Sequence, residues 1–370
     1  MKKIIKNLTA AVLIIFALTA LILDAKGMAD SAIKAIETCL YTIIPSLFGF
    51  MAVSSYLLNS GFYKVLFKPL YLIFRYIIKL NEEEFGIFLL SLFGGYPVGA
   101  KLISDRAVSS EQKPRDILPF CYCPSPGFAM SVAGTAIFSN AEIGLAVYVS
   151  NVLACVFLAV IFNFKNRKKP AAPAGIVEKH FLEATELSGR ERQSRLTVQP
   201  MNFSLSVFTS SILSASSALF PVCSVIVAFG FINEALRFFG AGRVLMLLGE
   251  KTDRIFFAMS EISNISGFPP NLSLLPLIAA IFSFGGFCII TQIPALTKGT
   301  VPLKRFFLWR IPAAVLSAII CKLIMPLFGF AFTMPVTAGH FIIPSEAGHP
   351  VASAALFIMA VMLVKTAEEK

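Results

Sequence analysis

Charged residues are scarce in this chain of 370 residues: they make up 14% of it, whereas 56% of the residues are hydrophobic. The common enzyme motifs are also missing, because no phosphate-binding Gly-Lys-Ser/Thr loop, no H-E-x-x-H zinc helix and no G-x-S-x-G nucleophile turn occurs. The polar stretches are too short to hold a catalytic domain. The composition therefore argues against an enzyme and predicts a membrane protein.

Cysteine is present, but not in a pattern that binds metal or builds a disulfide framework. The seven cysteines are an odd number and show no zinc-like spacing. Most of them lie within apolar stretches, where a small soft side chain commonly serves packing. They are Cys39, Cys121, Cys123, Cys155, Cys223, Cys288 and Cys321. We expect no metal and no cofactor.

Hydrophobic runs dominate the sequence, and several reach the roughly 20 residues that a helix needs to cross about 30 Å of hydrocarbon. The first run, residues 8–23, follows Met1-Lys2-Lys3 and could be mistaken for a secretory signal. No clear small-x-small cleavage site follows it, so we expect a retained signal-anchor helix within residues 1–30.

Basic residues concentrate in the polar segments between these runs, which accounts for the net charge of +11 without a nucleic-acid partner. The richest segment is 165–200, the only long polar stretch, and it predicts a solvated linker. By the positive-inside rule, this linker and both termini lie in the cytoplasm. The other basic segments assigned to the cytoplasm are residues 64–79, 101–115 and 298–305.

Together with the hydrophobic runs, these basic segments predict an all-α integral membrane fold with about eight transmembrane helices and two re-entrant hairpins. The hairpins are residues 85–104, entering from the cytoplasm, and 254–272, entering from outside. Residues 63–80 alternate cationic and aromatic side chains, which is typical of an interfacial helix, and residues 233–252 are expected on the outer face. The predicted spans are residues 8–23, 32–58, 117–139, 141–164, 203–232, 274–296, 306–330 and 350–364.

One interruption occurs in both predicted hairpins. Gly95-Tyr96-Pro97 and Gly267-Phe268-Pro269 each place Gly-aromatic-Pro inside an apolar stretch. Glycine and proline break a helix and free backbone N–H and C=O groups, which a bilayer tolerates only where protein or a water-filled cavity satisfies them. Paired interruptions in the two halves of a membrane protein point to a substrate site where the halves meet.

Two further matches have the same order along the chain. Pro45 and Pro221 lie mid-span in helices of opposite predicted orientation, and LPFCYCPSPGFAM (118–130) matches LPLIAAIFSFGGFCI (275–289) in its Leu-Pro and Gly-Phe positions. Three matches in order predict an inverted repeat, an architecture of transporters. The repeats are residues 31–164 and 201–370, joined by the linker at 165–200.

The segments SLFGGYPVGAK, FCYCPSPGF and EISNISGFP resemble the sporulation integral membrane protein YlbJ family, one of the nucleoside-recognition Gate domain families related to concentrative nucleoside transporters. The resemblance covers roughly residues 30–365. It implies a role in spore maturation, moving dipicolinate across the outer forespore membrane. The chain departs from the family at Cys121-Tyr122-Cys123, where Asn and small residues are expected.

The candidate substrate-binding residues lie at the breaks. Lys101 follows the first break, where it could face an anionic solute or snorkel to the headgroups, and the glycines could serve close helix packing instead. Ser125 and Gly127 lie where a helix must unwind, and free N–H groups there suit a carboxylate. Glu261 and Asn264 share a helix face and could bind a coupling cation or a substrate hydroxyl, or simply close the hairpin. The full set is Gly94, Gly95, Tyr96, Pro97, Gly99, Lys101, Ser125, Gly127, Glu261, Ser263, Asn264, Ser266, Gly267, Phe268 and Pro269.

The sequence therefore predicts a multi-pass bacterial membrane permease for a small polar solute, anionic if the family resemblance holds. One alternative is a nucleoside-type permease, which would depend on Glu261 and Asn264 rather than on Lys101. A second alternative is a non-transporting scaffold that recruits partners through the 165–200 linker. The expected partners are the lipid bilayer, the solute, a possible coupling cation and a possible second copy of the chain.

Overall fold

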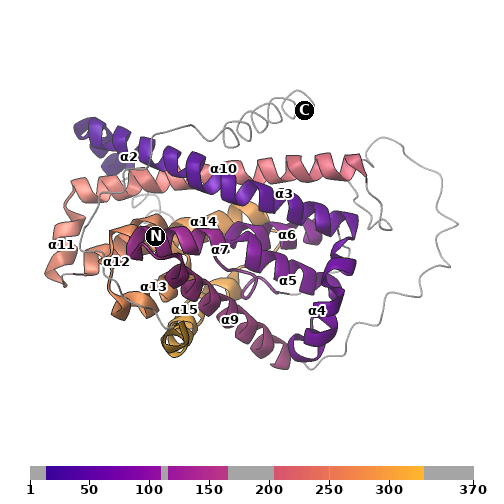
Figure 1. Ribbon diagram of the computed structural model, residues 1–370. Helices are drawn as coiled ribbons and strands as arrows, with labels where there is room; N and C mark the ends of the chain where they lie inside the picture. Colours follow the sequence, from indigo (N-terminus) through magenta and orange to yellow (C-terminus); the bar gives the residue numbers. More distant parts are fainter. Residues whose placement is uncertain (1–13, 110–115, 166–203, 250, 329–370) are drawn as a thin grey trace, which may run out of the picture.

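The computed structural model describes residues 14–109, 116–165, 204–249 and 251–328, and all regular structure among them is helical (Figure 1). A short helix, Ile14–Leu23, precedes the labelled elements. These are α2 (Ala25–Thr38), α3 (Ile44–Ser60), α4 (Tyr63–Ile78), α5 (Glu82–Gly94), α6 (Tyr96–Ser109), α7 (Pro126–Phe128), α8 (Ala136–Phe138), α9 (Ala141–Lys165), α10 (Leu205–Phe238), α11 (Ala241–Leu247), α12 (Thr252–Ser260), α13 (Leu275–Phe284), α14 (Gly286–Thr297) and α15 (Lys304–Ile324).

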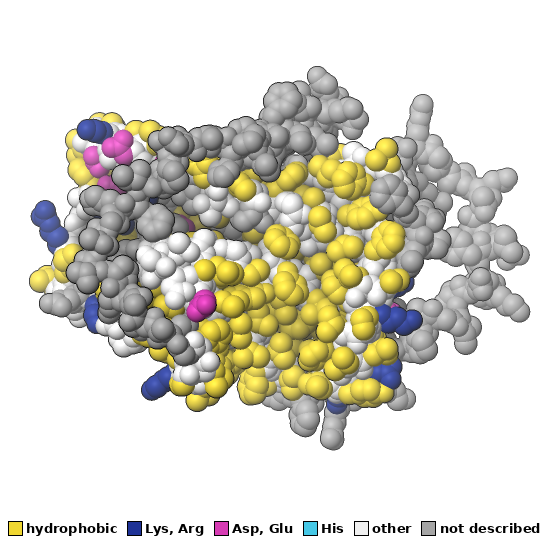
Figure 2. All heavy atoms as spheres, in the orientation of Figure 1, with side chains coloured by type: hydrophobic (Ala, Val, Ile, Leu, Met, Phe, Trp, Pro, Cys, Tyr) yellow, Lys and Arg dark blue, Asp and Glu magenta, His cyan; other side chains and the backbone are white. Residues whose placement is uncertain are grey.

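Within the described residues, four helices are long and apolar enough to cross a membrane. They are Ala141–Phe162, Leu205–Phe238, Leu272–Thr297 and Lys304–Phe328. A fifth span is present if the bent pair Ala25–Ile43 and Leu47–Ser60 counts as one. Figure 2 shows a broad hydrophobic surface with Lys and Arg side chains toward both ends. The all-helical prediction is therefore confirmed for the described residues, and four or five of the helices are able to span a membrane. The predicted span at 350–364 and the first six residues of the one at 8–23 lie outside the described residues.

The bent pair contains the first of the two matched prolines. A π-helical segment, Cys39–Ile43, joins α2 to α3, and the axes of the flanking helices differ by 47°. Pro45 stands in the first turn of α3, where its missing N–H removes a hydrogen bond from the preceding turn. Pro221, by contrast, lies inside α10, which continues unbroken.

The helix α10 runs antiparallel to this bent pair over most of its length (Figure 1). Ser31 at one end donates a 2.9 Å hydrogen bond to the carbonyl of Gly230, and at the other end Tyr56 packs edge-on against Phe208 with ring centroids 5.8 Å apart. Between them, the Cys39 thiol donates to the carbonyl of Cys223 at 3.8 Å. The first spans of the two predicted repeats therefore pack against each other in opposite directions.

The first predicted hairpin is present as α5 and α6. Asn81 and Glu84 form a capping box that starts α5, and Gly95 ends it with φ +89° and ψ 176°, a backbone conformation that essentially only glycine adopts. The chain then folds back, because Arg106 near the end of α6 forms a 2.8 Å ion pair with Glu83 at the start of α5. The break at Gly95 was predicted at its correct position.

The predicted span at 117–139 is wrong as a continuous helix. Residues 117–125 are buried but not helical, and only residues 126–138 are helical, as α7, a π-helical segment and α8. Pro119, Pro124 and Pro126 explain the difference, since each lacks an N–H and disfavours helix in the residue before it. Buried irregular backbone needs partners from elsewhere in the protein.

The second predicted hairpin breaks earlier than its sequence match suggested. The helix α12 ends at Ser260, Glu261 is extended with φ −141° and ψ 120°, and a 3₁₀ turn follows from Ile262 to Gly267. The Asn264 amide donates back to the carbonyl of Phe257 at 3.1 Å, which holds the turn against α12. Gly267 and its neighbours therefore lie at the end of this turn, and the helix is interrupted at Glu261.

Candidate functional site

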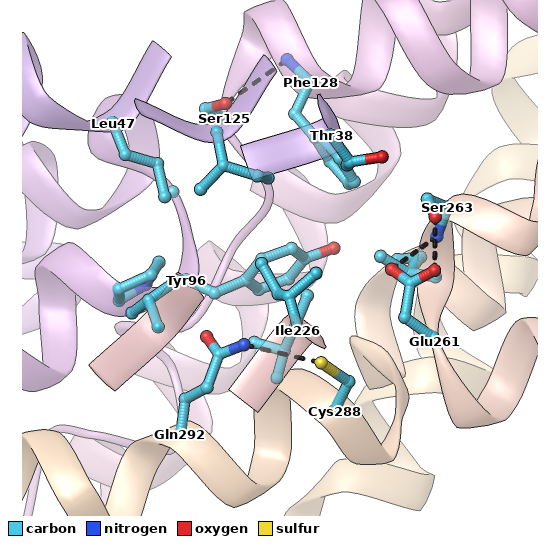
Figure 3. A pocket seen from close by; sticks show the side chains of 16 residues that line it. Thr38, Leu47, Tyr96, Ser125, Phe128, Ile226, Glu261, Ser263, Cys288 and Gln292 are labelled. Atoms are coloured by element: carbon cyan, nitrogen blue, oxygen red, sulfur yellow. Dashed lines mark hydrogen bonds between the residues drawn. The ribbon is translucent and has the colours of Figure 1, made fainter. Parts of the chain in front are cut away.

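Residues from both halves of the chain line a small cavity of about 40 Å³ (Figure 3). This volume has room for one or two water molecules. The first break contributes one wall and the second break contributes another. The lining residues are Thr38, Ile43, Leu47, Gly95, Tyr96, Pro97, Ser125, Phe128, Val222, Ile226, Glu261, Ile262, Ser263, Cys288, Ile289 and Gln292.

The first break reaches the cavity because Gly95 has no side chain. A Cβ at this position would press against Leu47 and Ser125, both of which line the cavity. Ser125 is buried and caps the short helix that follows, accepting a 3.3 Å hydrogen bond from the Phe128 amide. Two interruptions of the first half therefore meet at one wall of the cavity. The break between α5 and α6 contributes Gly95 and Pro97, and the irregular segment 117–125 contributes Ser125.

Two tyrosines satisfy the backbone carbonyls that a third break frees. The helix α13 ends at Gly285, with φ +87°, so the last carbonyls of its final turn lack helical partners. The Tyr96 hydroxyl donates to the carbonyl of Phe282 at 2.6 Å, and the Tyr122 hydroxyl donates to that of Phe284 at 3.3 Å. A Cβ at Gly285 would collide with the Tyr122 hydroxyl. The irregular segment of the first half and the break in α13–α14 of the second half are thus in direct contact.

Glu261 is the one acidic or basic side chain among the residues that line the cavity. Its carboxylate accepts a 3.0 Å hydrogen bond from the Ser263 amide and a second bond from the Ser263 hydroxyl (Figure 3). On another part of the lining, the Gln292 amide donates to the sulfur of Cys288, one turn earlier in α14, at 3.6 Å (Figure 3). The cavity therefore combines one acidic side chain, held by its own turn, with a mostly apolar wall.

A larger polar vestibule of about 330 Å³ adjoins the cavity. Thr38, Ile226, Glu261 and Ser263 line both, so the carboxylate lies where the two meet. The walls of the vestibule come from α2, α10 and the Glu261 turn. Its other polar lining residues are Asp30, Ser31, Lys34, Asn233, Glu234, Arg237 and Asn264. This volume falls within the range of small-molecule sites.

Lys101 does not line the cavity. Its ammonium group forms a 2.7 Å ion pair with Asp105 and a hydrogen bond with the Ser214 hydroxyl, and the side chain is buried. Gly94 and Gly99 serve close packing, since a Cβ would meet Val98 at the first and the carbonyl of Cys121 at the second. These three candidates belong to the body of the first hairpin.

The remaining candidates of the second half do not line the cavity. Asn264 and Gly267 line another cleft, and the Ser266 hydroxyl donates to the carbonyl of Ser263 at 3.0 Å. Phe268 is buried and Pro269 is exposed. Gly127, in the first half, is exposed, and no atom lies within 4 Å of a Cβ placed there.

Arg310 on α15 is a buried cationic residue beside the irregular segment that the sequence reasoning missed. Its side chain is 2% exposed, donates a hydrogen bond to the carbonyl of Pro119 and lies over the rings of Tyr122 and Phe306, at 4.5 and 4.7 Å. It supplies a donor to the irregular segment, and the rings supply cation–π contacts. A lone Arg in an apolar run was the available signal.

Thr38, Phe128, Cys288 and Gln292 were also missed, although all four line the cavity. Gln292 is the one with a sequence signal, since it is an amide in an otherwise apolar span. Comparison with family models, with curated proteins and with solved structures finds no match for this chain.

Proposed function

We propose that this protein is a multi-pass membrane permease for a small polar solute that binds at Glu261. The observation that carries this proposal is the meeting of the two breaks, at Gly95 and at Glu261, on one cavity that adjoins a solute-sized vestibule. Interrupted helices whose ends face a central cavity are typical of secondary transporters. The small cavity then corresponds to a closed state, and transport requires the hairpins to move apart.

The order of elements supports an inverted repeat. Each half begins with a long span (α2–α3, then α10), continues with a short helix (α4, then α11) and then has a broken hairpin (α5–α6, then α12 and its 3₁₀ turn). An interrupted segment and a long helix follow, with α9 closing the first half and α15 the second. The antiparallel packing of α10 against α2–α3 is the contact expected between two such halves.

The charges of the site favour an uncharged or cationic solute, such as a nucleoside. Glu261 is the one acidic side chain of the cavity lining, which holds no Lys or Arg, and Asp30 and Glu234 add acidic groups to the vestibule, against Lys34 and Arg237. A dianion in a low-dielectric cavity needs cationic or N–H-rich surroundings, whereas Lys101 is already paired with Asp105. The resemblance to the YlbJ family still supports dipicolinate and a place in the outer forespore membrane as the competing proposal.

The experiment is uptake by the full chain reconstituted in liposomes, with a labelled nucleoside, a small amine and dipicolinate as solutes. We expect uptake of the nucleoside or the amine, and a loss of about tenfold or more in Glu261→Gln, because the substitution removes the acidic group at which the solute binds. Glu37→Gln is the matched control, because Glu37 is exposed and lines neither cavity nor vestibule.

Two results would count against this proposal. Uptake of dipicolinate alone, unchanged in Glu261→Gln, would mean that the solute class and the site are both wrong. The scaffold alternative would be favoured if the protein took up none of the solutes and if deletion of residues 165–200 abolished its function in cells.

A further inference from the structure

At the end of the molecule where α11 and α12 lie (Figure 1), a third hollow, distinct from the cavity and larger than the vestibule, is lined by residues of these helices. It has a volume of about 400 Å³ and lies between the end of α10, α11, the start of α12 and the 3₁₀ turn. We call it the arginine cleft. Its lining residues are Arg237, Gly240, Gly242, Arg243, Met246, Asp253, Arg254, Phe257, Asn264 and Gly267.

The arginine cleft is cationic, with three Arg side chains and one Asp in its lining. Among the described residues, no ion pair holds any of these three Arg side chains. The guanidinium of Arg237 lies 4.6 Å from the centre of the Phe257 ring, a stacking that leaves its in-plane N–H groups free for an acceptor. Planar N–H forks of this kind match the oxygens of phosphate.

Large apolar side chains surround the cleft and face outward. Leu247 is 87% exposed and Leu248 is 75% exposed, and both stand at the end of α11 beside Met246 of the cleft wall. Such exposure is costly in water but favourable against acyl chains. A short helix that combines cationic side chains with exposed apolar ones is typical of the membrane interface. The chain therefore places phosphate-binding donors and an acyl-contacting surface side by side.

We propose that the arginine cleft binds the phosphate of an anionic phospholipid, whose acyl chains lie along the exposed leucines of α11. Positive charge here is not explained by the positive-inside rule, because the predicted topology puts this end of the molecule outside. The lipid lies next to the vestibule, since Arg237 and Asn264 line both hollows. This assignment is independent of which solute the protein carries.

The test is lipid binding by the purified full chain in a non-ionic detergent, measured by native mass spectrometry with phosphatidylglycerol and phosphatidylcholine as probes. We expect preferential retention of phosphatidylglycerol, weakened on the order of tenfold in the double variant Arg243→Gln/Arg254→Gln. Both arginines are exposed, so the substitutions leave the packing intact. The variant Arg243→Lys/Arg254→Lys keeps the charge and should retain most of the binding.

The matched control is Lys64→Gln/Lys68→Gln, which removes two exposed cations from α4 at the opposite end of the molecule. Equal loss of phosphatidylglycerol in both variants would show diffuse attraction and overturn the assignment. Displacement of the lipid by millimolar inorganic phosphate, with no effect of Leu247→Ser/Leu248→Ser, would show a site for a free anion and would also overturn it.

Discussion

At the scale of single residues, the interior of this protein depends on polar side chains that complete broken backbone. Tyr96 and Tyr122 serve the carbonyls at the end of α13, Tyr148 donates to the carbonyl of Leu92 at 3.2 Å near the end of α5, and Arg310 serves Pro119. An unsatisfied buried carbonyl costs more than the net gain of an ordinary hydrogen bond. These four side chains therefore fix where the helices can stop.

Tyr96→Phe should destabilise the protein by about 1–3 kcal/mol, because the carbonyl of Phe282 then loses its partner in a buried place. Tyr122→Phe should cost less, since its hydrogen bond is 3.3 Å long against 2.6 Å for Tyr96. The measurement is thermal or denaturant unfolding of the detergent-purified variants. Tyr41→Phe is the control, because Tyr41 is 54% exposed. Equal stability of the Tyr96 and Tyr41 variants would contradict this role.

At the scale of elements, the two hairpins differ in how far the sequence could predict them. The break at Gly95 is local, because a glycine-only backbone conformation and the following Pro97 decide it. The break at Glu261 has no such local signal. The helix ends there because Ser263 and Asn264 redirect the chain, and their partners, Glu261 and Phe257, are contacts that a Gly-Phe-Pro motif does not reveal.

This difference gives a prediction for the two matched glycines. Gly95→Ala should destabilise the protein by about 1–3 kcal/mol, because its φ of +89° strains any L side chain and the new methyl presses on Ser125. Gly267→Ala should change stability by less than about 0.5 kcal/mol, because a Cβ there meets no atom within 4 Å. The measurement is the unfolding midpoint of each variant. Similar losses of stability in the two variants would contradict the difference between the two glycines.

The candidate site was predictable only in part. Polar residues inside apolar runs drew attention to Glu261, Ser263 and Ser125, and all three line the cavity. Thr38 and Gln292 line it as well, because α10 packs against both α2 and α14, a long-range arrangement that no local pattern encodes. Lys101 was expected near the site because it follows the break directly, but Asp105, one helical turn later, pairs with it.

At the scale of the whole molecule, the long helix α10 is longer than a bilayer crossing requires. Its 34 residues, at about 1.5 Å each, give roughly 50 Å, more than the about 30 Å of a hydrocarbon core. Its last turns therefore extend beyond the hydrocarbon or tilt within it, and they form a wall of both the vestibule and the arginine cleft. The helix α4 lies at the opposite end (Figure 1).

The predicted topology assigns these two ends to opposite sides of the membrane. Lys68 on α4 and Lys251 before α12 are both exposed, so Lys68→Cys and Lys251→Cys should fold normally. Six of the seven native cysteines are buried, which keeps background labelling low. In intact cells, a membrane-impermeant maleimide should label Lys251→Cys at once and Lys68→Cys only after permeabilisation, because the basic α4 end is cytoplasmic. The reverse pattern would invert the protein and place the vestibule in the cytoplasm. Labelling of both variants from one side would show that α10 does not span the membrane and would contradict the inverted repeat.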